Sequence, residues 1–162
     1  MSKTAFVAAM AGSVFALDQL TKTMIRHSVP LYHSIPVLDE VFNITHAQNT
    51  GGAFSLFASA PDAIRAPFFL IAAAVAVAAL LYFLNTVGPS QRLLQFALAG
   101  ILGGALGNLF DRLTSGTVTD FLDVYWRDHH WPAFNVADSF ITIGVLILLG
   151  HSLLTEQRST NK

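Results

Sequence analysis

Residues 66–84 read APFFLIAAAVAVAALLYFL, a run without any charged side chain. A helix of this length rises about 30 Å at roughly 1.5 Å per residue, which matches the hydrocarbon thickness of a bilayer. A run this long and this apolar is not typical of a core helix in a soluble chain of 162 residues. The stretch therefore predicts a transmembrane helix and places the protein in the membrane.

Three further apolar runs have the length for the same role: residues 5–25, 93–110 and 134–154. The first is purely apolar only to residue 17, so it crosses the bilayer only if it carries Asp18 and Lys22 into the outer leaflet. A cleaved signal peptide is the alternative for this N-terminus, because Lys3 followed by an apolar run imitates one. The apolar pattern continues beyond the polar interruption, which favours a retained helix.

We therefore predict an all-α polytopic membrane protein with four transmembrane helices and one domain over residues 1–162. Its two longer connections contain VFNITH at 41–46 and VTDFLDV at 118–124, where apolar and polar residues alternate as in short strands. These strands would form a small extracytoplasmic β element. In the third apolar run, close helix packing is predicted by the spacing of Gly100, Gly103, Gly104 and Gly107.

The composition excludes several classes of function. Hydrophobic residues make up 53 % of the chain and charged residues 12 %, with a mean hydropathy of +0.54, values that argue against a disordered chain or an ordinary soluble domain. The net charge of −1 lacks the basic surface that nucleic acids require, so we expect no nucleic-acid partner. With no cysteine, and no pair of the six histidines at the spacing of a zinc-protease helix, we expect no metal site.

The distribution of charge predicts the orientation. Basic residues gather near the two termini and the short connection at 85–92, which places the termini in the cytoplasm. The first and third helices then end outside, and the fourth begins there. Polar residues consequently fall in one leaflet, where the loop residues Asn49 and Asp120 also lie: Asp18, Lys22, Asn108, Asp111, Arg112, Asn135 and Asp138.

Most of these polar groups allow a structural interpretation. Asp18 and Lys22 stand four residues apart in the favourable acid-first order, so an ion pair explains them without chemistry. Asp111 ends a helix at the interface, where a structural role is favoured. Arg112 allows two roles: its side chain can snorkel to the interface, or it can bind an anionic or carbonyl group. We interpret Asp123 as a solvated loop charge.

Asp120 and Asp138 differ from the rest. They stand at opposite ends of one loop that returns them toward the same point, and Asp138 has no basic neighbour at helical spacing. An unpaired carboxylate within a membrane needs a proton, or a second carboxyl that shares one. Two such carboxyls can activate water, one as general base and the other as the acid that protonates a scissile carbonyl.

Five motifs in this order resemble those of the signal peptidase II family of bacterial membrane aspartic peptidases: DQLTK at 18–22, NTGGAFS at 49–55, GNLFDR at 107–112, VTDF at 118–121 and FNVAD at 134–138. The resemblance covers nearly the whole chain. It implies a monomer in the bacterial inner membrane, with the active site near the outer face. The implied substrates are diacylglyceryl prolipoproteins held in membrane lipid and cut before the lipidated cysteine, without any cofactor.

By motif position, the resemblance makes Asp120 and Asp138 the catalytic pair. It implies that substrate is bound by Asn49, Gly51, Asn108, Arg112 and Asn135. The supporting residues would be Asp18, Lys22 and Asp111.

A small proton-coupled transporter or channel subunit is the alternative from another class. In it Asp18, Asp111 and Asp138 would relay protons, as intramembrane carboxyls do in pumps. Such a pathway needs polar residues in both leaflets, whereas only His151 marks the inner half of the predicted helices. A purely structural membrane partner is a third possibility, and it has no need for an acidic site in one leaflet.

Overall fold

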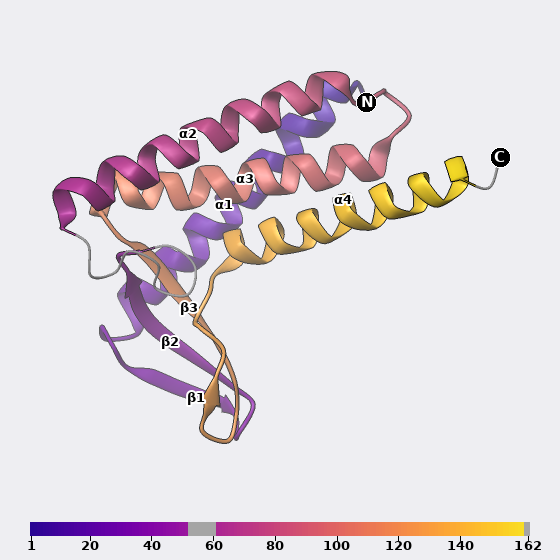
Figure 1. The fold of residues 1–162 in the computed structure, drawn as a ribbon. Helices are drawn as coiled ribbons and strands as arrows, with labels where there is room; N and C mark the ends of the chain where they lie inside the picture. The colour runs from indigo at the N-terminus through magenta and orange to yellow at the C-terminus, as the bar shows by residue number, and fades with distance from the viewer. Residues whose placement is uncertain (52–60, 161–162) are drawn as a thin grey trace.

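The computed structural model describes residues 1–51 and 61–160, and it consists mainly of four helices (Figure 1). These are α1 (Lys3–Ser28), α2 (Asp62–Thr86), α3 (Arg92–Ser115) and α4 (Val136–Thr160). Each is long and apolar enough to cross a membrane by length and composition. The predicted helical fold with a small β element is confirmed, and that element is an antiparallel sheet.

The helices differ from the apolar runs by a few residues at their ends, and two of these ends have a clear physical cause. α3 continues past residue 110 to Ser115, where it is capped by Gly116. The φ of Gly116, 74°, is left-handed and its N–H donates to the carbonyl of Arg112, a common way to end a helix. α4 begins two residues later than predicted, because Phe134 pairs with Leu122 of the sheet instead. Sequence hydropathy detected the apolar stretch and missed both of these backbone features.

The sheet has four antiparallel strands in the order β1 (Ser34–Leu38), β2 (Phe42–Asn49), β3 (Val118–Trp126) and β4 (His129–His130). The two predicted strands are β2 and β3, and they pair with each other. β1 and β4 were not predicted. A proline interrupts the pattern of β1, and β4 has only two residues, too few for a periodic signal.

α3 is the central helix and packs against the other three. A Cβ on its Gly103 would lie 2.5 Å from the carbonyl oxygen of Ala11 on α1, and one on Gly104 would lie 2.5 Å from that of Ala137 on α4. Helices approach this closely only through small residues, so the predicted role of the glycines is confirmed.

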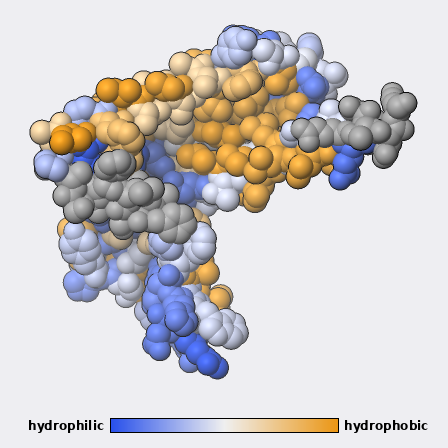
Figure 2. Space-filling model, viewed as in Figure 1, coloured by the Kyte–Doolittle hydropathy of each residue, from blue (hydrophilic) through white to orange (hydrophobic). Residues whose placement is uncertain are grey.

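The helices run side by side, and the sheet projects from one end of the bundle, opposite the two chain termini (Figure 1). Hydrophobic surface covers much of the helices in the view of Figure 2, while hydrophilic groups gather on the sheet. On α2 the exposed residues include Ile71, Val75 and Leu81. This surface suits a bilayer, and the sheet then lies at one membrane face.

Candidate functional site

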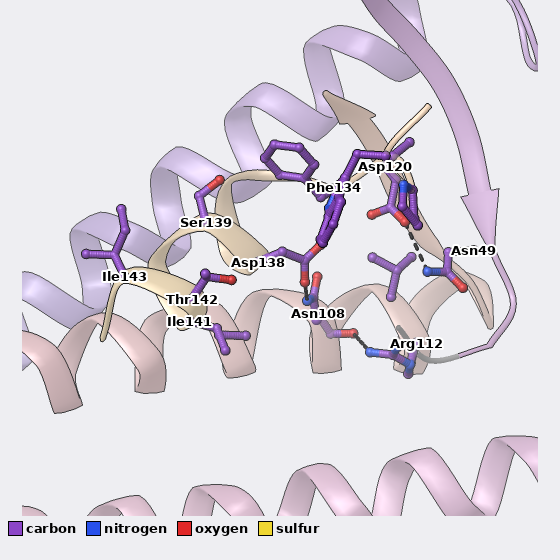
Figure 3. Close-up of a pocket in the computed structure, with 14 residues that line it drawn as sticks. Asn49, Asn108, Arg112, Asp120, Phe134, Asp138, Ser139, Ile141, Thr142 and Ile143 are labelled. Carbon is purple, nitrogen blue, oxygen red and sulfur yellow. Dashed lines mark hydrogen bonds between the residues drawn. The ribbon is translucent and has the colours of Figure 1, made fainter. Parts of the chain in front are cut away.

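A cavity of about 560 Å³ opens where the sheet meets the bundle (Figure 3). Five of the residues singled out from the sequence line it: Asn49, Asn108, Arg112, Asp120 and Asp138. The rest of its wall comes from β3, from the loop before α4 and from the first turns of α4, including Trp131, Phe134, Ile141 and Ile143. The cavity therefore combines a polar floor with an apolar wall.

Asp138 lies in the first turn of α4, where it forms a reciprocal cap with Asn135. The side-chain oxygen of Asn135 accepts from the N–H of Asp138 at 2.9 Å, and the N–H of Asn135 donates to Oδ2 of Asp138 at 3.2 Å. The amide of Asn108 donates to the other oxygen, Oδ1, at 2.8 Å. The positive end of the α4 helix dipole also points at this carboxyl, so hydrogen bonds and the dipole together hold Asp138 in place.

Asp120 reaches the same cavity from β3 and is almost fully buried. Its carboxyl accepts from the amide of Asn49 at 3.1 Å and from that of Asn135 at 2.7 Å. Burial, followed by the negative charge of Asp138, raises the pKa of Asp120 to about 7, against the opposing effect of these hydrogen bonds and of Lys22. Near neutral pH, Asp120 is therefore poised between its protonated and ionised forms.

Two buried amides connect the carboxyls. Asn135 contacts both aspartates, and its Nδ2 also lies 3.2 Å from Oδ1 of Asn108, whose own Nδ2 donates to Asp138. Figure 3 shows the bonds from Asn108 to Asp138 and from Asn49 to Asp120 as dashed lines. The predicted convergence of Asp120 and Asp138 on one place is what the structure shows.

Behind this floor lies a fully buried ammonium, that of Lys22 on α1. It lies 2.8 Å from Oδ2 of Asp18 and 3.1 Å from Oδ2 of Asp111 on α3. The predicted ion pair of Asp18 and Lys22 is thus present, and Asp111 extends it to another helix. Gln19, the second residue of the DQLTK motif, donates to Asp18 and Asp111 and belongs to the same cluster.

Arg112 closes one side of the cavity. Its guanidinium donates to the carbonyl of Gly51 at 3.2 Å and to that of Asn108 at 3.3 Å, and it lies over the ring of Phe69, 5.1 Å from the centroid. Gly51 donates in turn to the side chain of Asn49. The guanidinium thus lies on the wall of the cavity.

Not every predicted residue lies on the cavity wall. Asn135 has no exposed surface and stands behind the two aspartates, and Gly51 contacts Arg112 and Asn49 from outside the wall. Residues 52–55 of the second motif lie outside the described residues. The interpretation of Asp123 as a solvated charge is wrong: it is buried, accepts from Asn43 at 2.9 Å and pairs with Nδ1 of His130 at 2.8 Å.

The apolar wall gave no signal in the sequence. Trp131, Pro132 and Phe134 belong to a loop, where hydrophobic residues have no period to reveal which way they face. Within the described part of the chain, no three histidine or acidic side chains come together as metal ligands would. The arrangement can therefore perform proton transfer with two carboxyls beside an apolar binding surface.

Comparison with known proteins gives consistent matches. The family described as Signal peptidase (SPase) II matches residues 10–154. The lipoprotein signal peptidase of Geobacter sulfurreducens is 46 % identical over 153 residues, 94 % of each chain, and that of Desulforapulum autotrophicum is 44 % identical over 143 residues, 88 % of each. A solved structure of a bacterial membrane enzyme is 32 % identical with a TM-score of 0.82, covering 96 % of this chain and 91 % of its own.

Proposed function

Because the chain belongs to the signal peptidase II family, and is therefore a membrane-embedded peptidase, we propose that Asp120 and Asp138 are its catalytic pair. The observation that supports this most strongly is that both carboxyls line one cavity and share the buried amide of Asn135. Two carboxyls in such a site share a proton more readily than both ionise.

In the proposed reaction Asp138 is the general base and Asp120 the general acid. Asp138, stabilised as an anion by the α4 N-terminus, takes a proton from water as the water oxygen attacks the scissile carbonyl carbon. Asp120 gives its proton to the carbonyl oxygen, which yields a neutral tetrahedral diol. Asp138 then returns its proton to the leaving amine nitrogen, the C–N bond breaks, and a diol proton passes back to Asp120.

We assign the substrate as a prolipoprotein whose cysteine carries diacylglyceryl, cut just before that cysteine. The two relatives named above are lipoprotein signal peptidases, and the cavity wall supplies apolar side chains such as Ile141 and Ile143 beside the dyad. Acyl chains in the bilayer would hold the cysteine at the depth of the headgroups. The dyad belongs at the same depth if it is to cut there.

Three of the predicted substrate-binding residues keep that role in the proposal. Asn49, Asn108 and Arg112 present amide and guanidinium groups to the cavity, where they can bond the substrate backbone. Asn135 and Gly51 do not contact the substrate in this proposal but position the residues that do. Asn135 bonds to the aspartates, and Gly51 bonds to Asn49 and Arg112.

We propose that the enzyme lies in the bacterial inner membrane as a monomer without a cofactor, with both termini in the cytoplasm. The basic residues near the termini support this orientation. A reporter fused after Lys162 should report cytoplasm, and one inserted at residue 62 should report the opposite side. The reverse pattern would contradict the placement of the dyad at the outer face.

Purified protein in detergent tests the function directly. A reporter peptide with a lipobox and a diacylglyceryl cysteine should be cut into two fragments, with the new amino terminus on the lipidated cysteine. A proton-coupled transporter would leave this peptide intact and move protons in liposomes. An intact peptide under conditions where the protein is folded would rule out the proposed function.

A further inference from the structure

The buried Lys22 makes one contact that an ion pair does not explain. An ammonium has three N–H donors, and the acceptors of two of them are the carboxylates of Asp18 and Asp111. The third donor goes to Oδ1 of Asn108 at 2.9 Å. Lys22 has no exposed side-chain surface, so its ammonium cannot bond to bulk water. One of its three N–H donors is therefore committed to a neutral amide.

That amide is the one that contacts Asp138. A side-chain amide carries its oxygen and its nitrogen on opposite sides, and an ammonium can only donate. The bond from Lys22 therefore fixes Oδ1 of Asn108 toward α1 and leaves Nδ2 toward Asp138, where the two groups lie 2.8 Å apart. Reversing the amide would set Nδ2 against the ammonium, donor against donor, and Oδ1 against the carboxylate of Asp138, acceptor against acceptor.

The same ion pair holds the backbone beside Asp138. Oδ1 of Asp18 accepts from the N–H of Ala137, the residue before Asp138, at 2.9 Å. Gly107 on α3 makes room for this carboxylate, since a Cβ there would contact Oδ2 of Asp18. α1 thus holds the first turn of α4 in two ways. Asp18 bonds directly to the N–H of Ala137, and Lys22 acts on Asp138 through the Asn108 amide of α3.

We propose that Lys22 is a positioning residue of the hydrolytic reaction, one that orients the Asn108 amide and thereby the carboxylate of Asp138. The inference rests on the proposed function of the aspartate pair. A purely structural ion pair would affect stability alone. A positioning role also affects the turnover and protonation of the dyad.

The charge of Lys22 gives this role a distinct readout. The charged groups that act on Asp120 come from three helices: Lys22 on α1, Arg112 on α3 and Asp138 on α4. Among them Lys22 lowers the pKa of Asp120, against the burial and the Asp138 charge that raise it. Removing the ammonium should therefore raise the pH at which Asp120 loses its proton.

The test compares Asp111→Asn with the double variant Lys22→Met/Asp111→Asn. The double variant keeps the net charge of the original triad, since one anion is removed together with the cation, and this limits misfolding from unpaired buried carboxylates. Lys3→Met is the matched control: Lys3 is on the same helix, and its ammonium also bonds, to the carbonyl of Val87 at 2.7 Å. Lys3 lies at the end of the bundle away from the aspartate pair.

We expect kcat for the lipidated peptide to fall about 10²-fold from Asp111→Asn to the double variant, the size of effect that misplaced catalytic groups produce. KM should stay nearly constant, because Lys22 is not on the cavity wall. The alkaline limb of the pH profile should move to higher pH. Carbon-13 NMR of labelled aspartate, assigned with Asp120→Asn, should show the same shift for the Asp120 carboxyl.

Lys22→Gln/Asp111→Asn separates orientation from charge. Its amide can still donate to Asn108, so part of kcat should return while the alkaline limb stays displaced. The proposal would be overturned if these variants differed only in melting temperature. In that case kcat, the alkaline limb of the pH profile and the titration of Asp120 would all be unchanged. Failure of the proposed function itself shows differently, as activity retained by Asp120→Asn.

Discussion

The two ends of the helix bundle are held together by different forces. Toward the termini, α1, α2 and α3 meet through a cluster of Ala11, Leu84, Leu98, Ala99 and Leu102. Toward the sheet, the contacts between α1, α3 and α4 pass through buried polar groups, with Lys22 at their centre. One end is an apolar core and the other a hydrogen-bonded network.

The two ends therefore differ in what they can contribute: the apolar end stabilises the bundle, and the polar end can hold reactive groups in place. Apolar contacts have no direction, so the terminal end tolerates changes of shape that keep the volume. Buried polar groups cost free energy unless each is bonded, and they permit few arrangements. The network end is therefore the part of the molecule able to hold two carboxyls in a fixed geometry for proton transfer.

Removing the acyl chains from the substrate should cause the largest loss of activity that tests this difference between the two ends. We propose that the network end lies at headgroup depth, where a peptide without acyl chains would no longer be held. We expect kcat/KM for an unlipidated lipobox peptide to fall by more than about 10³-fold, which corresponds to about 4 kcal/mol. Equal kcat/KM for the two peptides would place the site away from the membrane interface.

Arg112→Lys should have the next largest effect. A guanidinium offers parallel donors in a plane, whereas an ammonium is a point charge, and Arg112 both contacts the carbonyl of Gly51 and lines the cavity. We expect a loss of activity of about 10- to 100-fold, or about 1.4 to 2.7 kcal/mol, in a protein with an unchanged melting temperature. Full activity would return Arg112 to an interfacial snorkelling role.

A methyl group added at Gly103 tests the apolar contacts. Its Cβ would lie 2.5 Å from the Ala11 carbonyl oxygen and 2.8 Å from Cβ of Val14, so α1 and α3 must separate. Overpacking of this kind costs about 1–3 kcal/mol, and thermal unfolding in detergent should report it. Gly12→Ala is the control, because nothing lies within 4 Å of its Cβ position; a similar loss there would show that helix contact is not the cause.

The pH dependence of activity and stability tests the buried carboxyl of Asp120. Asp120 must be protonated to act as the acid, so kcat/KM should decline as pH rises through about 7. The folded protein binds this proton more tightly than the unfolded chain, whose carboxyl has an ordinary pKa near 3.8. Stability should therefore fall as pH rises from about 4 to 7, by up to about 4 kcal/mol. Asp120→Asn should abolish that fall, and a melting temperature equally pH-dependent in the variant would contradict it.

The sequence predicted the elements of the fold better than the contacts of the site. The length of the apolar runs found the four helices, and alternation found β2 and β3, because both signals lie within one continuous stretch of sequence. The N-cap of α4 by Asn135 moved the start of that helix, and the burial of Asp123 by Asn43 and His130 could not be anticipated from a local pattern. Such contacts join residues far apart in sequence, and only the folded chain brings them together.

The asparagine variants of the dyad test the central claim most directly. Asparagine keeps the size of the side chain but cannot take up or release the proton. Asp120→Asn and Asp138→Asn should each lower cleavage of a lipidated prolipoprotein by at least about 10³-fold, with no further multiplicative loss when combined. Their melting temperatures should be unchanged or raised, since a buried like charge is removed.

Asp123→Asn provides the matched control, on the same strand as Asp120 and bonded outside the cavity. The decisive measurement is kcat/KM of the three purified variants on one lipidated substrate, with the melting temperature of each recorded alongside. We expect two folded, inactive proteins and one active control. An active Asp138→Asn, or inactivity that follows from unfolding, would contradict it.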